Sequence, residues 1–266
     1  MCEANVYINR EGREELLMEK VDRIIPGEDN NIFLESIFGE RKIVQARIRE
    51  MELVHHRVVL EEVKQEIATP DKEIWLEPET DHGHFHEGEE VKLKVFQGYN
   101  MRAEGRPACS ELKAFAVVDG EVRPIDIAEK EDCGEINLGS EVDGLIQVYV
   151  LESGEIDSYA KIVVEVGHHH HHGLQAIALP LEIIPCDYSH ARMGESYEVQ
   201  VLKEGKPLPG ALVRATFAGT RNRDYPHKLN TNDEGKVKIF LTAKGNYLFS
   251  VNDGEIRSTF TLMKSF

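Results

Sequence analysis

Short alternations of apolar and polar residues recur along nearly the whole chain, and no long amphipathic helical pattern lies between them. Alternation with a period of two is typical of a half-buried strand, because successive side chains point to opposite faces of a sheet. Val91, Leu93 and Val95 alternate with lysines in this way. Turn sequences such as Asp253-Gly254 separate the segments at short intervals. This spacing predicts an all-β protein.

Turns and shifts in composition divide the 266 residues into four segments. Residues 1–66 predict a small antiparallel β-barrel or sheet, in which residues 13–19 are also compatible with a helix. Residues 73–166 and 179–266 predict two immunoglobulin-like β-sandwich domains. Residues 167–178 between them predict a histidine-rich loop or linker. A domain as small as the first has little core of its own, so we expect it to be stabilised by dimerisation.

The charge balance limits the classes of partner. The chain has 31 Lys and Arg against 48 Asp and Glu, which gives a formal net charge of -17. This excess argues against nucleic acid and against an anionic membrane surface, and it favours a cationic ligand. No apolar run approaches the roughly 20 residues that span a bilayer. The first residues show neither a basic nor an apolar signal segment, so we expect a cytoplasmic protein.

The sequence contains no pattern typical of an enzyme. A nucleotide-binding glycine motif, a Ser-His-Asp spacing and a nucleophile elbow are all absent from the chain. No nucleophile, base and orienting group can be combined from its motifs. We therefore expect a binding protein and not a catalyst.

Cys2 is a candidate metal ligand because of its position. If Met1 is removed, the α-amine and the thiolate of Cys2 can chelate one ion in a five-membered ring. Thiolate and nitrogen donors in a square plane suit Ni(II) or Cu(II), and a tetrahedral set suits Zn(II). A two-fold axis in a dimer would double the donors. The same residue is also compatible with an N-terminal cysteine that has no role.

Eight of the twelve histidines lie in two short tracts. His82, His84 and His86 alternate, so an extended chain would place all three rings on one face, where they could hold Zn, Ni or Cu. A polar loop is the alternative. The second tract is a run of five consecutive histidines that resembles an affinity tag and would bind Ni(II) or Zn(II) weakly in either case. Its members are His168, His169, His170, His171 and His172.

The remaining cysteines and the pair His55-His56 give weaker signals. Cys109, Cys133 and Cys186 are widely spaced and form no CxxC motif, so we expect small buried residues and no disulfide framework. For His55 and His56, a surface role and metal ligation are equally compatible with the sequence.

The first 60 or so residues resemble the CooT family of small nickel-binding proteins. The resemblance rests on Met1-Cys2, Val6-Tyr7, Phe38-Gly39-Glu40, Arg47-Ile48 and Val58-Val59-Leu60-Glu61. It implies a cytoplasmic homodimer, formed here through the N-terminal domain, that is associated with maturation of a nickel-dependent carbon monoxide dehydrogenase. It also implies that Cys2 is the nickel ligand.

The remainder of the chain, from about Ile74, resembles NikM-like two-domain proteins of nickel transport. The matching stretches are Trp75-Leu76-Glu77-Pro78, Leu179-Pro180-Leu181-Glu182-Ile183-Ile184-Pro185, Gly205-Lys206-Pro207-Leu208-Pro209-Gly210-Ala211 and Thr231-Asn232-Asp233-Glu234-Gly235. Such proteins usually have a signal peptide, whereas this chain begins with a CooT-like domain. The resemblance implies metal binding more than transport.

Together these features predict a cytoplasmic nickel-binding protein that acts as a metallochaperone or reservoir for a nickel enzyme, with carbon monoxide dehydrogenase as the first candidate client. Cys2 would form the specific site and the histidine tracts would add weaker ones. One alternative is a general buffer or sensor of divalent metals, which would bind Zn(II), Co(II) or Cu(II) as readily as Ni(II). The other is a sandwich module that binds a protein or a glycan and uses no metal.

Overall fold

The computed structural model is almost entirely β-structure and confirms the predicted fold class. It describes residues 3–10, 13–27, 31–62, 72–80, 84–118, 120–167, 174–186, 192–222 and 224–265. The one helical element in these ranges is a single 3-10 turn, η1 (Cys109–Glu111). Within the same ranges, no helix has the length and apolarity needed to cross a bilayer.

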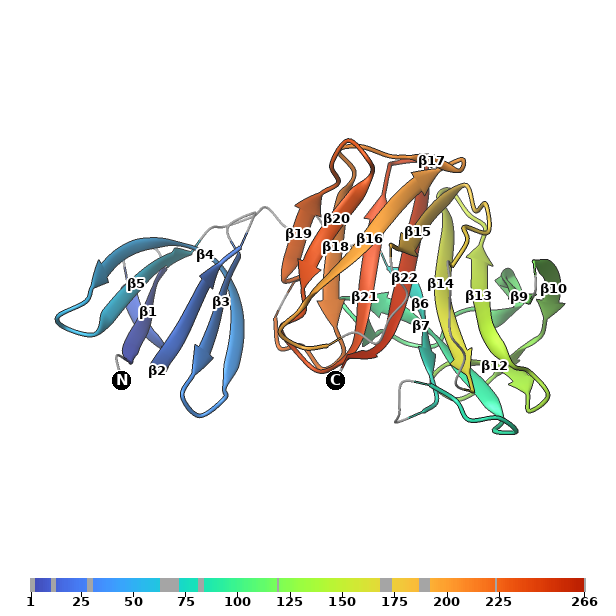
Figure 1. The fold of residues 1–266 in the computed structure, drawn as a ribbon, viewed down its shortest axis with the longest axis horizontal. Helices are drawn as coiled ribbons and strands as arrows, with labels where there is room; N and C mark the ends of the chain where they lie inside the picture. The colour runs from blue at the N-terminus through green and yellow to red at the C-terminus, as the bar shows by residue number, and fades with distance from the viewer. Residues whose placement is uncertain are drawn as a thin grey trace. The chain divides into compact units, whose positions relative to one another are not determined.

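The N-terminal strands form a closed five-stranded barrel (Figure 1). Its strands are β1 (Ala4–Arg10), β2 (Arg13–Pro26), β3 (Asn31–Ser36), β4 (Arg41–Glu52) and β5 (Arg57–Glu62). Consecutive strands pair antiparallel, whereas β1 and β5 pair in parallel and close the barrel. An odd number of alternating strands requires this, because the first and the fifth run in the same direction.

The alternating apolar residues of the barrel point inward, as their period of two predicts. Val6, Ile8, Leu34 and Leu60 are buried in one cluster. β2 departs from the pattern and occupies the segment that was also compatible with a helix. Register shifts against β1 and β3 interrupt its alternation, and its buried side chains are three residues apart instead of two. An irregularity of this kind changes which face the next residues occupy and so obscures the strand signal.

The chain divides into two compact units, Met1–Thr69 with Asn222–Leu229, and Pro70–Arg221 with Asn230–Phe266. The larger unit contains both predicted sandwich segments except for residues 222–229, and strands of the two segments share an eight-stranded sheet. In spatial order its strands are β10 (Glu121–Ile125), β9 (Leu112–Val118), β13 (Gly144–Glu152), β14 (Asp157–Val166), β22 (Ile256–Ser265), β21 (Gly245–Asn252), β18 (Leu212–Phe217) and β19 (His227–Asn230).

Two smaller sheets complete the sandwich region. The first has the order β11 (Ile127–Glu129), β12 (Gly134–Gly139), β7 (Val91–Tyr99) and β6 (Glu73–Pro78), with β8 (Arg102–Ala103) paired to β7. The second contains β15 (Leu181–Pro185), β16 (Ser196–Lys203), β17 (Lys206–Pro207) and β20 (Lys236–Phe240). The division of this region into two separate domains, 73–166 and 179–266, stays a prediction.

The parallel pairing of β14 with β22 joins the two halves of the eight-stranded sheet (Figure 1). It runs from Asp157 opposite Ile256 to Ile162 opposite Thr261. A polar contact also connects the two halves, since the carboxylate of Glu73 on β6 accepts a hydrogen bond from Arg214 Nη2 on β18 at 2.7 Å. Trp75, on the same strand as Glu73, is also buried. The two halves are therefore continuous through both backbone and side chains.

Candidate functional site

Cys2, the strongest predicted ligand, lies outside the described residues. The first described residue is Glu3, and β1 starts at Ala4. The backbone N–H of Asn5 donates to the carbonyl oxygen of His56 at 2.8 Å, and Asn5 lies opposite Arg57 in the parallel pair of β1 and β5. The start of β1 is thus fixed beside the turn between β4 and β5.

The turn between β4 and β5 exposes an unusual amount of apolar surface. Six of the eight large apolar side chains that are exposed among the described residues belong to the barrel: Leu16, Ile37, Phe38, Met51, Leu53 and Val54. Met51, Leu53 and Val54 lie within four residues of one another, and we call them the β4–β5 tip. Leu53 is 78% and Val54 86% exposed. Grouped apolar residues at a surface are typical of an interface with a partner.

The sequence interpretation missed this tip. The alternation of Met51 and Leu53 predicts a strand through both residues, whereas β4 ends at Glu52 and Leu53 lies in the turn. His55 and His56 lie in the same turn and are exposed. Since apolar residues at a tight turn are unfavourable in water without a second role, the pair Leu53-Val54 was the signal that could have identified the surface.

The first histidine tract is described at His84 and His86, and His82 lies outside the described residues. The two imidazole rings are 4.9 Å apart between centroids, with an angle of 81° between their planes. Phe85 between them is fully buried in the sandwich core. The backbone N–H of His86 donates to the carboxylate of Glu89 at 2.9 Å and orders the turn that follows. His86 is exposed, whereas His84 is half-buried and its Nε2 atom is covered by the protein.

The backbone of Phe85 connects this tract to the end of β14. Phe85 forms a parallel bridge with Val166, its N–H donates to the Glu165 carbonyl at 2.8 Å, and its carbonyl accepts from the Gly167 N–H at 2.8 Å. Gly167 is the last described residue before the second histidine tract, and all five members of that run, 168–172, lie outside the described residues. The position between His84 and His86 is thus hydrogen-bonded to the residue that precedes His168.

The described ranges contain no group of three or more His, Cys, Asp or Glu side chains arranged to hold a metal ion. The three described cysteines do not belong to a metal-binding group either. Cys109 and Cys133 are buried, and desolvation raises the pKa of both. Cys186 is exposed, contrary to the expectation of a buried residue. Metal ligation by Cys2 and by the histidines stays a prediction.

We expect Cys186 to react slowly with alkylating reagents although it is exposed. Desolvation and the nearby Glu198 carboxylate raise the pKa of its thiol to about 11, against about 8.5 for a free cysteine. The smaller thiolate fraction at pH 8 is offset in part by the higher nucleophilicity of a more basic thiolate, which leaves a reaction roughly twentyfold slower. The rate measured with iodoacetamide should keep rising about tenfold per pH unit up to pH 10. A rate that levels off near pH 8.5 would contradict the raised pKa.

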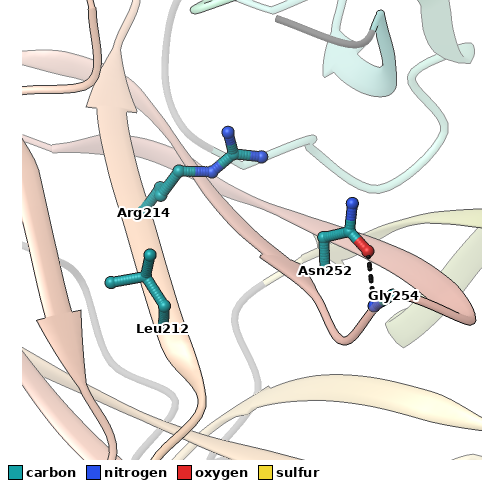
Figure 2. A pocket seen from close by; sticks show the side chains of 4 residues that line it. All are labelled: Leu212, Arg214, Asn252 and Gly254. Carbon is teal, nitrogen blue, oxygen red and sulfur yellow. Dashed lines mark hydrogen bonds between the residues drawn. The ribbon is translucent and has the colours of Figure 1, made fainter. Parts of the chain in front are cut away.

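The larger unit also has a shallow cavity of about 350 Å³, lined by Leu212, Arg214, Asn252 and Gly254 (Figure 2). The Asn252 side-chain oxygen accepts a hydrogen bond from the Gly254 N–H at 2.9 Å and shapes one wall. Arg214 enters it from β18 and also pairs with the buried Glu73. The lining includes none of the predicted metal ligands.

Comparison with known families gives two matches along the chain. Residues 1–61 match the family described as CO dehydrogenase accessory protein CooT, and residues 146–253 match a domain of unknown function, DUF4198. These matches confirm the predicted fusion of a CooT-like domain to a second family. DUF4198 has no described function, so the link of the sandwich region to nickel transport stays a prediction.

Among solved structures, the chain is similar to a protein described as CooT from Carboxydothermus hydrogenoformans. Identity is 46%, and the match covers 24% of this chain and 100% of that chain, with a TM-score of 0.22. It is also similar to the D0-D1 domain of intimin, at 14% identity over 73% of this chain and 97% of that one, with a TM-score of 0.25. Alpha-2-macroglobulin from Escherichia coli matches at 10% identity over 98% of this chain and 20% of that one, with a TM-score of 0.27. No curated protein matches the chain.

Proposed function

Because residues 1–61 belong to the CooT family of CO dehydrogenase accessory proteins, we propose that this protein binds Ni(II) and supplies it to a nickel enzyme, with carbon monoxide dehydrogenase as the first candidate client. The family match carries the proposal, and it begins at Met1, so it includes Cys2. An accessory role is consistent with a protein that has no catalytic activity of its own. We further propose that it acts in the cytoplasm, where its client would be assembled.

In this proposal, Cys2 supplies the specific site. After removal of Met1, its thiolate and α-amine can bind one Ni(II) as a chelate, and both are donors that this ion accepts in a square plane. One chelate fills only part of a square plane and leaves coordination positions for donors from a second chain. The net charge of -17 raises the concentration of cations near the surface to a modest, salt-dependent extent.

A homodimer through the barrel would complete this site. The start of β1 lies beside the turn between β4 and β5, through the hydrogen bond from Asn5 to His56. The exposed β4–β5 tip belongs to the same turn. A second copy of this chain, packed across a two-fold axis at the tip, would cover the apolar residues and bring two Cys2 residues to the same end of the barrels. The tip therefore supports a shared site with one ion for two chains.

A transfer assay tests the accessory role directly. Nickel-free carbon monoxide dehydrogenase is mixed with nickel-loaded protein in the presence of a chelator that captures free Ni(II). We expect the protein to restore enzyme activity, and we expect Cys2→Ser to restore no more than the chelated metal alone. Cys186→Ser is the matched control, because it removes an exposed thiol outside the CooT domain. Equal activation by Cys2→Ser would contradict the proposed role of Cys2.

A further inference from the structure

The shallow cavity of the larger unit lies on one face of the paired strands β18 and β21. Arg214 is opposite Ser250 in their antiparallel register. Leu212 precedes Arg214 by two residues and Asn252 follows Ser250 by two, so strand alternation places these four side chains on one face. Arg214 and Asn252 are diagonal neighbours, a separation that long side chains can bridge. Gly254, in the turn after β21, completes the lining of this cavity of about 350 Å³ (Figure 2).

Buried partners fix the position of Arg214. Its Nη2 donates to Glu73 Oε1 at 2.7 Å and to the Ser250 hydroxyl at 3.2 Å. The Ser250 hydroxyl in turn donates to the same oxygen of Glu73. Glu73 and Ser250 are fully buried, whereas the Arg214 side chain is 23% exposed. The guanidinium is therefore held from the interior and placed in the wall of the cavity.

Asn252 turns the donor end of its side-chain amide away from the turn. Its Oδ1 accepts a hydrogen bond from the Gly254 N–H at 2.9 Å. Because an N–H must be met by an oxygen, this bond identifies Nδ2, with its two N–H groups, as the other end of the amide. Figure 2 shows Nδ2 turned away from Gly254, toward the side of the cavity on which the Arg214 guanidinium lies.

The negative charges near the cavity are matched by cations of their own. Asp253 lies in the turn beside it, but its Oδ2 is 2.7 Å from Lys203 Nζ, and its Oδ1 accepts hydrogen bonds from two backbone N–H groups. Glu73 is buried against Arg214. None of the described residues that line the cavity is acidic. The polar side chains of the lining thus offer N–H donors, and Leu212, 46% exposed, offers an apolar wall.

We propose that this cavity binds a small organic acid, with its carboxylate between the Arg214 guanidinium and Asn252 Nδ2 and its apolar chain against Leu212. A carboxylate is an acceptor for both donors, and charge-assisted hydrogen bonds of this kind are the strong ones. A volume of about 350 Å³ suits a small ligand, since such pockets span roughly 300–1,000 Å³. The site uses neither Cys2 nor a histidine, so it does not depend on the function proposed above.

A titration of the full chain with hexanoate tests this proposal. The probe has one carboxylate and a short apolar chain, and the backbone amide NMR signal of Gly254 reports its binding. We expect this signal to shift, with a dissociation constant in the millimolar range or below. Hexanamide has the same length without the charge, and acetate has the charge without the chain. Each of the two should bind at least about tenfold more weakly than hexanoate.

Asn252→Asp is the most informative variant. It keeps an oxygen for the Gly254 N–H but replaces the donor Nδ2 by a second carboxylate oxygen, so hexanoate should bind at least about tenfold more weakly. Asn232→Asp is the matched control, because Asn232 Oδ1 accepts the Glu234 N–H at 3.0 Å in another exposed turn of the same unit. This control should bind hexanoate as the wild type does. Circular dichroism reports whether each variant folds.

Leu212→Ala separates the apolar contact from the charged one. It should weaken hexanoate binding several-fold and leave acetate binding unchanged, because acetate has no chain to place against this residue. Arg214 is left intact in all variants, since its removal would leave Glu73 as a buried charge without a cation.

Three results would overturn the proposal. The first is a Gly254 signal that does not move at hexanoate concentrations well above the millimolar range. The second is hexanamide binding as tightly as hexanoate, which would mean that the carboxylate is not recognised. The third is equal hexanoate affinity in the wild type and in Asn252→Asp. None of these results bears on nickel binding by Cys2, which lies in the other family segment.

Discussion

Glu182→Ala is expected to destabilise the sandwich unit by about 3–5 kcal/mol, the cost of removing one partner from a buried ion pair. Lys161 Nζ and Glu182 Oε1 are 2.5 Å apart, and both side chains are 1% exposed. Burial lowers the pKa of Lys161, and the charge of Glu182 opposes that shift. Without the carboxylate, Lys161 is left as a buried and uncompensated charge. The backbone N–H groups of Ile177 and Leu179 lose their acceptor at the same time.

Chemical unfolding followed by tryptophan fluorescence measures this loss, since Trp75 is the chain's one tryptophan and is buried in the same unit. Glu255→Ala is the matched control. Glu255 pairs with Lys203 at 2.8 Å, but its side chain is 76% exposed, so its removal should cost no more than about 1 kcal/mol. Equal losses of unfolding free energy in the two variants would contradict the prediction that the buried pair stabilises the protein more than the exposed one.

Leu53→Ser with Val54→Ser is expected to raise the dissociation constant of the proposed homodimer at least about a hundredfold. A fully buried side chain of this size contributes roughly 1.5–3 kcal/mol, and a two-fold axis would bury each changed residue twice. Leu53 and Val54 are exposed in the single chain and contribute little to the barrel core, so the folded monomer should keep its stability.

Sedimentation velocity over a range of concentrations measures the change in association. Val122→Ser is the control, because Val122 is also more than half exposed but lies on the sandwich strand β10. A wild-type protein that dimerises and a Leu53→Ser, Val54→Ser variant that dimerises equally well would show that the interface lies elsewhere.

The fold class could be predicted from local pattern because strand periodicity is a local property. Val6 with Ile8 and Val91 with Leu93 alternate and are buried as expected. The pairing of β14 with β22 could not be predicted, because strand neighbours far apart in the chain leave no local signal. The irregular register of β2 masked a 14-residue strand for the related reason that a register shift breaks the period.

The same distinction between local pattern and long-range contact applies to the candidate sites. Alternation predicted that His84 and His86 share one face, and their rings lie together. That Phe85 bridges to Val166 depends on a contact between distant segments and on burial of the Phe85 ring, neither of which the tract itself encodes. Likewise, the closeness of Asn5 to His56 follows from barrel closure and not from either segment alone.

The central claim is that Cys2 binds nickel, and a titration of Ni(II) into protein from which Met1 has been removed tests it most directly. The absorption band for charge transfer from thiolate to nickel reports this site alone, because imidazole ligands do not produce it. We predict a band that saturates at about half an equivalent per chain, disappears in Cys2→Ser and persists in Cys186→Ser, as one ion shared by two chains requires. Absence of the band, with nickel binding unchanged in Cys2→Ser, would contradict the account.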